Sequence, residues 1–414
     1  MSKRRKPFNL LRITFLAGVV GVAIYVNQVI VPTVQPIGVP TATATRDPEA
    51  YVTDAEQLAN QGKLNQAIDA YSQVIQARPK DAASYVAMAR LQVWVGKYAD
   101  AQKSAEYALL LNPNYSTAHA VRGWALDFQG KYADAETSIQ RALALDPNNA
   151  LAHAYYAELL GDMYGSNTGP LDAIQKASDE SKTALALGPN LLEAHRARGY
   201  ILYLGQNYAL AVGEYQAAIA INKNIEDLQV NLGLNYTALQ LPDEAIAAFT
   251  LAISLNPTDP LPNLYISRVD AGIGKYVQAL QYAEDAVKNA PAEPAFHGNL
   301  GEMYYRNFKY SSAAQELAYS LYGGTLADGT VVKPLDLNTS PRASEYLYTY
   351  GLVLAKSDQC GAALPIAQQI LDKLRGDDVA VFNANEINRL CTLSAQTTPT
   401  PELTPVPLTP TPTP

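Results

Sequence analysis

Residues 121–149 read VRGWALDFQGKYADAETSIQRALALDPNN, and this stretch decides the fold. Small and apolar residues recur in it at helical spacing until a Gly-Lys pair interrupts the pattern, and a second amphipathic segment then ends in Asp-Pro. These are the signals of two helices joined by a short turn. The stretch therefore predicts a helical hairpin.

The hairpin is one copy of a repeat with a period of 34 residues. Nine copies fit within residues 48–377 if two insertions, near 165–172 and 328–343, are allowed. Because a single hairpin cannot bury its apolar face, successive hairpins are expected to stack into a solenoid. One column is alanine in all nine copies: Ala67, Ala101, Ala135, Ala177, Ala211, Ala245, Ala279, Ala313 and Ala363.

These units resemble the tetratricopeptide repeat, because the quoted stretch has its small residues, tyrosine, alanine and proline in the same order. The resemblance implies an all-α fold, a right-handed superhelical solenoid of about nine hairpins. We expect a capping helix at residues 378–393 to close the stack. The resemblance says little about function beyond a concave groove that binds partners.

The N-terminal end differs from the repeat. Five basic residues lie in residues 1–12, and the 19 residues from Ile13 to Val31 carry no charge. A helix over residues 13–31 is about 28 Å long, close to the hydrocarbon thickness of a bilayer, so we expect one transmembrane helix there. A cleaved signal peptide is the alternative, although its apolar part is normally shorter.

This arrangement predicts a membrane-anchored protein of bacterial type. The basic segment 1–12 should stay in the cytoplasm, which places the repeats outside the cytoplasmic (inner) membrane. Residues 32–47 are rich in Pro and Thr and predict an extended spacer. Residues 394–414 alternate Thr and Pro and predict a disordered tail.

Charge argues against nucleic acid as a partner. The chain of 414 residues has 31 basic and 39 acidic residues, and five of the basic ones lie in the first twelve positions. The remainder therefore carries 26 basic against 39 acidic residues, a net charge of −13. Such a body repels phosphate backbones.

Catalytic, cofactor and metal motifs are not found. The Gly-Lys pairs lack the second glycine and the hydroxyl residue of a phosphate-binding loop. All four histidines occupy the fourth position of a first helix, which puts them in separate repeats, too far apart to share a metal: His119, His153, His195 and His297. We therefore expect no enzyme activity, no cofactor and no metal.

The candidate binding residues are aromatic and arginine side chains in the columns that line the groove in this family. Residues of these types dominate interface energetics because they bury a large area and keep a polar handle. They are Arg90, Trp94, Trp124, Phe128, Arg196, Tyr200, Tyr203, Arg268, Tyr305 and Arg306. Trp94 and Trp124 are the only tryptophans, so a peptide bound across repeats two and three should change the tryptophan emission.

The leading functional hypothesis is an adaptor that binds extended segments of other proteins. A protein that binds carbohydrate or a cell-envelope polymer is the alternative, since aromatic rings also stack on sugars. We further expect a tight hairpin on Asp328-Gly329 within the second insertion. A disulfide between Cys360 and Cys391 is also predicted, because the capping helix should return beside the start of the last second helix.

Overall fold

The computed structural model describes residues 10–30, 47–340 and 342–397. The expected basic segment, spacer and tail lie wholly or mostly outside these residues. Within them the chain forms twenty α-helices, one π-helical turn and one two-stranded hairpin, which confirms the all-α class.

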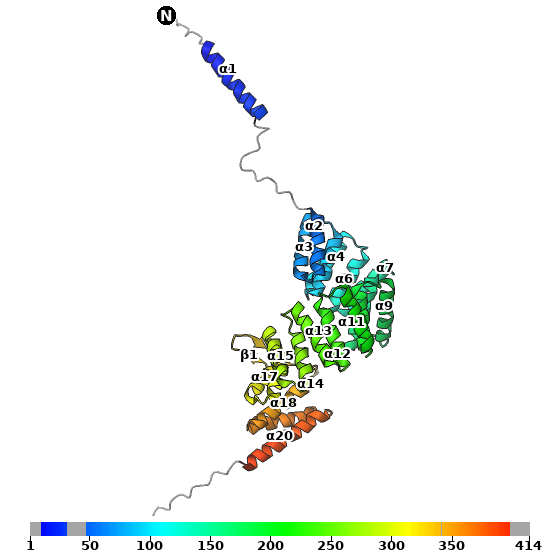
Figure 1. Cartoon of the computed structure of the whole chain (residues 1–414), viewed down its shortest axis with the longest axis vertical. Helices are drawn as coiled ribbons and strands as arrows, with labels where there is room; N and C mark the ends of the chain where they lie inside the picture. The colour runs from blue at the N-terminus through cyan, green and yellow to red at the C-terminus, as the bar shows by residue number, and fades with distance from the viewer. Residues whose placement is uncertain (1–9, 31–46, 341, 398–414) are drawn as a thin grey trace, which may run out of the picture.

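Nine pairs of helices form the hairpins, and each pair contains a first helix and a second helix (Figure 1). The pairs are α2 (Pro48–Asn60) with α3 (Leu64–Ala77), α4 (Ala82–Trp94) with α5 (Tyr98–Leu111), α6 (Ser116–Asp127) with α7 (Tyr132–Leu145), α8 (Ala150–Gly165) with α9 (Ala173–Leu187), α10 (Leu192–Leu204) with α11 (Tyr208–Ile221), α12 (Glu226–Ala238) with α13 (Pro242–Leu255), α14 (Leu261–Gly272) with α15 (Tyr276–Asn289), α16 (Pro294–Arg306) with α17 (Tyr310–Tyr322), and α18 (Ala343–Lys356) with α19 (Cys360–Lys373). The last helix, α20 (Asp378–Thr397), packs on α18 and α19 and extends beyond the residue 393 expected from the sequence.

Small residues sit where the two helices of a hairpin cross. A Cβ atom added to Gly123 of α6 would lie 2.4 Å from the Ile139 side chain of α7, and one added to Gly233 of α12 would lie 2.6 Å from Phe249 of α13. The repeated alanine column is fully buried at the same crossings, at Ala67, Ala101 and Ala135 for example. Close approach of the two backbones therefore explains why these columns stay small.

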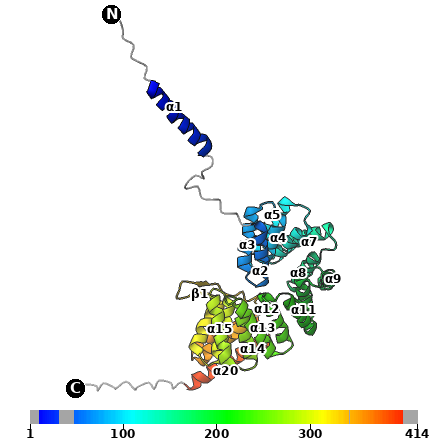
Figure 2. The same cartoon turned by 45° about the horizontal axis from the view of Figure 1, so that its top comes forward.

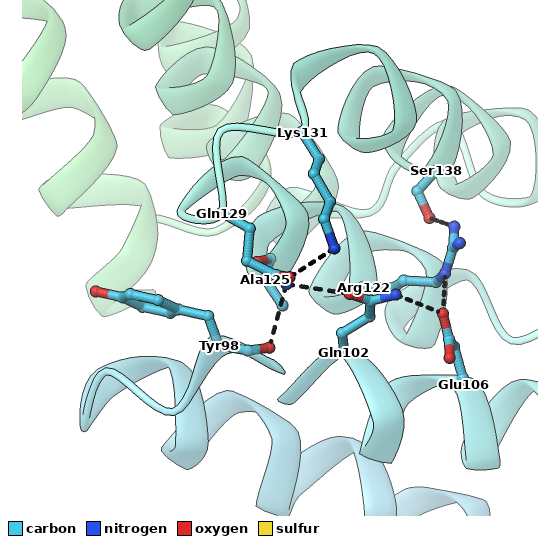
Figure 3. Close-up of polar contacts among 8 residues, drawn as sticks. All are labelled: Tyr98, Gln102, Glu106, Arg122, Ala125, Gln129, Lys131 and Ser138. Carbon is cyan, nitrogen blue, oxygen red and sulfur yellow. Dashed lines mark hydrogen bonds and ion pairs between the residues drawn. The ribbon is translucent and has the colours of Figure 1, made fainter. Parts of the chain in front are cut away.

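Polar contacts on the flanks hold neighbouring hairpins in register (Figure 3). Arg122 of α6 donates to Glu106 of α5 and to Ser138 of α7, each at 3.1 Å. Gln129, in the turn after α6, donates to Gln102 of α5 at 3.1 Å. The Arg122–Glu106 and Gln129–Gln102 contacts join neighbouring repeats, and the Arg122–Ser138 contact joins the two helices of one hairpin. The polar contacts therefore connect helices that also pack together through the apolar core.

The second insertion forms the hairpin predicted from the sequence. Strands β1 (Gly324–Thr325) and β2 (Val331–Val332) pair antiparallel, with Gly324 opposite Val332. Asp328 and Gly329 lie in the connecting loop, where Gly329 has a φ of +90° and the Asp328 carboxylate accepts from the Thr330 N–H at 2.9 Å.

The predicted bond between Cys360 and Cys391 is present, with a Cα–Cα distance of 5.4 Å. It joins the first residue of α19 to the C-terminal part of α20, because α20 runs back along the last hairpin.

The N-terminal helix α1 (Leu10–Tyr25) is 16 residues long and continues into the π-helical turn η1 (Val26–Ile30). No helix in the described part of the chain has both the length and the apolar character needed to cross a bilayer. The transmembrane helix expected at residues 13–31 is therefore not supported by the structure.

Candidate functional site

The coil formed by the first six hairpins closes on itself (Figure 2). The Asn224 side-chain amide, before α12, donates to the carbonyl oxygen of Asn60, at the end of α2, at 2.8 Å. Arg90 of α4 forms an ion pair with the buried carboxylate of Glu193 in α10. The first helices of these repeats therefore surround a shared inner surface, and residues more than one hundred positions apart meet there.

Arg196 of α10 lies at the centre of this inner surface. It pairs with Glu158 of α8 and with Asp227 of α12, where its Nε lies 2.7 Å from an Asp227 oxygen. Its guanidinium carbon is 5.2 Å from the ring centroid of Trp94 and 5.9 Å from that of Phe128. Burial acts to lower the pKa of Arg196, but the two carboxylates outweigh it and raise that pKa.

Trp124 was expected to face a ligand, and the structure corrects this. Its side chain is only 1% exposed. Its ring stacks on Tyr155 of α8, with centroids 4.4 Å apart, and meets the edge of Trp94. Its indole N–H donates to Glu158 at 2.9 Å. Because α6 and α8 pack directly on one another, this ring belongs to the core, although it is also among the residues that line the recess beside Trp94.

The same inner surface contains carboxyl groups with raised pKa values. Asp127 is 3% exposed, and neither carboxyl oxygen has a hydrogen-bond partner among the described residues. Burial, and next the charge of Asp162, raise the pKa of Asp127 to about 9. Burial likewise raises the pKa of Glu158 to about 7. Tyr200 donates to Asp162, so this candidate residue is also engaged within the chain.

A recess of about 550 Å³ opens beside this cluster. Trp94, Tyr98 and Phe128 line it from the α4–α7 side, and the Tyr98 and Phe128 rings stack with centroids 4.9 Å apart. Phe128 is 37% exposed. Glu226 and Asp259 line it from the α12–α14 side. Burial, and next the charge of Asp259, raise the pKa of Glu226 to about 9.

A second recess of about 410 Å³ lies on the other side of Trp94, between α2, α4 and the α10–α12 region. Arg90 and Glu193 line it together with Glu56 and Tyr71. Burial raises the pKa of Tyr71. The expected groove through the first repeats is thus divided into separate recesses by side chains that bridge it.

The remaining candidate residues lie in three places. Arg268 and Arg306 line one cavity of about 250 Å³ in the second half of the chain. Tyr203 packs beside Tyr208, with centroids 5.7 Å apart, and Tyr305 packs beside Tyr310. The structure therefore joins Arg90, Trp94, Trp124, Phe128, Arg196 and Tyr200 into one cluster and leaves the other four outside it.

The carboxylates of this surface were missed by the sequence analysis, although they lie in the columns it used. Glu193 and Asp227 are the second residues of α10 and α12, and Glu158 is the ninth residue of α8. The signal in the sequence is the presence of opposite charges in the same columns, which indicates that the arginines are paired within the chain.

The histidines pack within their own repeats, where they contact the loop before the first helix and, in three cases, the second helix of the same hairpin. Each Nε2 lies 2.8–3.0 Å from the carbonyl oxygen of the proline six residues earlier. In three of them Nδ1 meets a glutamate: Glu180, Glu214 or Glu316. Among the described residues no group of three or more His, Cys, Asp or Glu is arranged to hold a metal ion.

Comparison with known proteins supports the repeat assignment. Residues 86–150, 121–160 and 267–328 match one model described as tetratricopeptide repeat, and residues 226–259 match another. Anaphase-promoting complex subunit 6 of Arabidopsis thaliana is 27% identical over 119 residues, which cover 29% of this chain and 22% of that protein. The chain therefore matches only about a fifth of the length of this relative.

Two solved structures are similar at low sequence identity. One, from a functional characterization of Pseudomonas aeruginosa pilF, has a TM-score of 0.42 and 20% identity, and the match covers 49% of this chain and 89% of that one. Yeast Tom70 has a TM-score of 0.40 and 13% identity and covers 85% of this chain and 99% of its own. The family-model matches, together with the nine hairpins, support assignment of this chain to the tetratricopeptide repeat family.

Proposed function

We propose that this protein is a membrane-anchored adaptor that binds an extended segment of a partner protein in the recess beside Trp94. Tetratricopeptide repeats imply a scaffold for protein–protein interaction, and proteins built from them are generally not enzymes. The observation that carries the proposal is the 550 Å³ recess, because it combines an accessible aromatic wall with Glu226, whose buried Oε1 has no hydrogen-bond partner in the described part of the chain.

The recess has the properties of a binding site for a few side chains. Its volume falls within the range of ligand sites, which is roughly 300–1,000 Å³. The stacked rings of Tyr98 and Phe128 offer a flat apolar surface, and Phe128 is exposed enough to contact a partner. Aromatic side chains fixed in this way bind with little loss of rotamer entropy.

The membrane anchor is proposed for α1 together with the basic residues before it. Apolar side chains are exposed on all sides of α1, including Phe15, Leu16, Val20 and Val22. A helix that is apolar all round requires an apolar environment. By the positive-inside rule the repeats would then lie outside the cytoplasmic membrane.

Crosslinking in the native host, followed by recovery of the full-length chain, tests the binding site. We expect Trp94→Ala combined with Phe128→Ala to lower the yield of the crosslinked partner at least about fivefold, as for loss of an interface hot spot. Leu110→Ala is the matched control, because Leu110 is exposed on the second helix α5. Equal recovery with all variants would mean that the recess is not the binding site.

Protease accessibility tests the anchor. The host's outer envelope layer is permeabilised while the cytoplasmic membrane is left intact, and protease is then added. We expect the repeats to be degraded and the protein to require detergent for extraction. Protection of the repeats, or extraction by salt alone, would contradict the proposed location.

A further inference from the structure

We infer that a second site, in the cavity between α14, α16 and the start of α18, binds an acidic side chain of a polypeptide partner. The cavity has a volume of about 250 Å³ and is separate from the recess beside Trp94. Its lining includes three arginines and two glutamates: Arg268, Arg306, Arg342, Glu302 and Glu345. Either site can exist without the other.

The charges within the cavity do not cancel. Arg342 donates to Glu302 at 2.9 Å and to Glu345 at 2.6 Å, so one arginine engages both glutamates. Arg306 is more distant from Glu302, at 3.6 Å, and its side chain is 47% exposed. Arg268 forms no ion pair with any residue in the described part of the chain. The cavity therefore keeps an excess positive charge, although the chain as a whole is acidic.

Two buried polar atoms at this cavity have no hydrogen-bond partner within residues 10–30, 47–340 and 342–397. One is Nε of Arg268, a donor, and the other is Oδ1 of Asn299, an acceptor. Asn299 is fully buried and donates through Nδ2 to the Ser267 hydroxyl at 2.9 Å. Both atoms are enclosed by the protein, so they show that the wall of the cavity is polar, and a ligand would contact the accessible parts of the arginine side chains.

An acidic peptide segment supplies the negative charge that this cavity lacks. Its carboxylate accepts a charge-assisted hydrogen bond from the Arg268 guanidinium. The Tyr346 phenol also lies beside Arg268. Burial raises the pKa of Tyr346, and the charge of Arg268 offsets part of that rise. A neutral phenol leaves the arginine charge uncompensated, so this contact does not replace a carboxylate.

Peptide binding to the full-length chain in an uncharged detergent tests the inference. The probe is the decapeptide (Glu-Gly)₅, blocked at both ends and labelled with a dye, and (Gln-Gly)₅ with the same dye is its neutral counterpart. We expect the glutamate peptide to bind at least about fivefold more tightly, as for a charge-assisted contact. We also expect 0.5 M salt to weaken its binding.

Three variants locate the site. Arg268→Gln should weaken binding of (Glu-Gly)₅ at least about fivefold. Arg375→Gln, on an exposed arginine after α19, should leave it unchanged. Glu345→Gln should tighten it about two- to threefold, because this change removes a competing carboxylate from Arg342. If the arginines were only structural, Glu345→Gln would not improve binding.

The outcomes separate this inference from the proposed function. Equal affinity for the two peptides, or an unchanged affinity in Arg268→Gln, would overturn the acidic-side-chain site. The variant Trp94→Ala with Phe128→Ala should bind (Glu-Gly)₅ as the original chain does. Loss of binding in that variant would place the peptide in the first recess and would also overturn the inference.

Discussion

At the scale of single residues, the histidine column shows how a repeat position acquires an electrostatic role. The proline carbonyl at Nε2 and the glutamate at Nδ1 are both acceptors, so each ring nitrogen of His153 and His297 is best satisfied when it carries a proton. His119 lies in the same column, but Ser138 occupies the place nineteen residues later where His195 and His297 have glutamate.

We predict that His153 and His297 titrate above the ordinary histidine pKa and that His119 titrates below it. The hydrogen bond that His153 donates to Glu180 raises the pKa of His153. For His297, burial lowers the pKa, but the hydrogen bonds to Glu316 and to the Pro291 carbonyl, with the nearby negative charges, outweigh burial and raise it. Burial lowers the pKa of His119. NMR titration of ¹³C-labelled histidine rings measures all three. Glu316→Gln should lower the pKa of His297; an unchanged value would show that the contact is absent in solution.

The raised pKa values of His153 and His297 also determine the direction in which stability changes with pH. Because the folded pKa values of His153 and His297 are raised, their stabilisation is complete below the unfolded pKa of about 6.5 and is lost as the pH rises through the folded values. Replacing either histidine with Gln should therefore lower the free energy of unfolding more at pH 6 than at pH 8. Urea denaturation at both pH values checks this, and a larger effect at pH 8 would contradict it.

A second prediction at this scale concerns Asp127. Its pKa of about 9 means that ionisation is unfavourable in the folded state, so the wild-type chain loses stability as the pH rises from about 4 towards 9. Asp127→Asn removes the ionisation and should raise the free energy of unfolding at pH 8 relative to the original chain. Asp134→Asn, on the exposed first turn of α7, is the control. A destabilised Asp127→Asn at pH 8 would mean that the carboxylate has a counter-ion.

At the scale of helices and turns, much of the structure could be predicted from the sequence. The glycines at the turns have φ values of +75° at Gly62, +74° at Gly96 and +69° at Gly130. The period therefore located each turn through a backbone requirement. Gln206, Gln240, Phe308 and Asp358 occupy the same column in other repeats and also have positive φ, so the period locates these turns too, although these residue types do not themselves favour that conformation.

We predict opposite effects from two changes at equivalent turns. Gly96→Ala should destabilise the protein by about 1 kcal/mol through backbone strain alone, because an added Cβ meets no atom within 4 Å. Gln240→Gly should stabilise it by roughly 0.5–1 kcal/mol, since relief of strain exceeds the entropy cost of glycine. Chemical denaturation measures both. Effects of the same sign would exclude backbone strain as their cause.

The disulfide acts on the last hairpin and the capping helix. The cysteines are 31 residues apart, and closing a loop of that length stabilises the folded state by about 3–4 kcal/mol in the chain-entropy model. We expect Cys360→Ser with Cys391→Ser to increase hydrogen exchange in α19 and α20 while α6 and α7 stay unchanged. Exchange rates in α19 and α20 that do not change when the disulfide is removed, or that rise equally in all helices, would contradict a local role of the disulfide.

At the scale of the whole molecule, the closure of the first six hairpins was not predictable from the repeat columns. It depends on how closely successive first helices pack, and residues such as Gly161 decide this, since a Cβ added there would lie 2.8 Å from Tyr200 of the next repeat. The period shows which residues face inward. It does not show that Arg90 of α4 reaches Glu193 of α10, three repeats later, because that requires the pitch of the superhelix.

We predict that the Arg90–Glu193 pair holds this closure. Arg90→Gln leaves the buried Glu193 carboxylate without its counter-ion and should cost about 2–4 kcal/mol. Double substitution with Glu193→Gln should recover part of the loss, because neither charge then remains unpaired. Urea denaturation of the three variants gives the coupling. Additive effects of the two substitutions would show that the residues do not interact.

The central claim is that a partner occupies the recess beside Trp94. Hydrogen–deuterium exchange of the full-length chain, with and without the partner recovered by crosslinking, tests it most directly. We predict new protection at the α4–α5 and α6–α7 turns and in the segment between α13 and α14, which border the recess. Protection confined to the second helices α5, α7, α9 and α11, with the recess unchanged, would contradict the account.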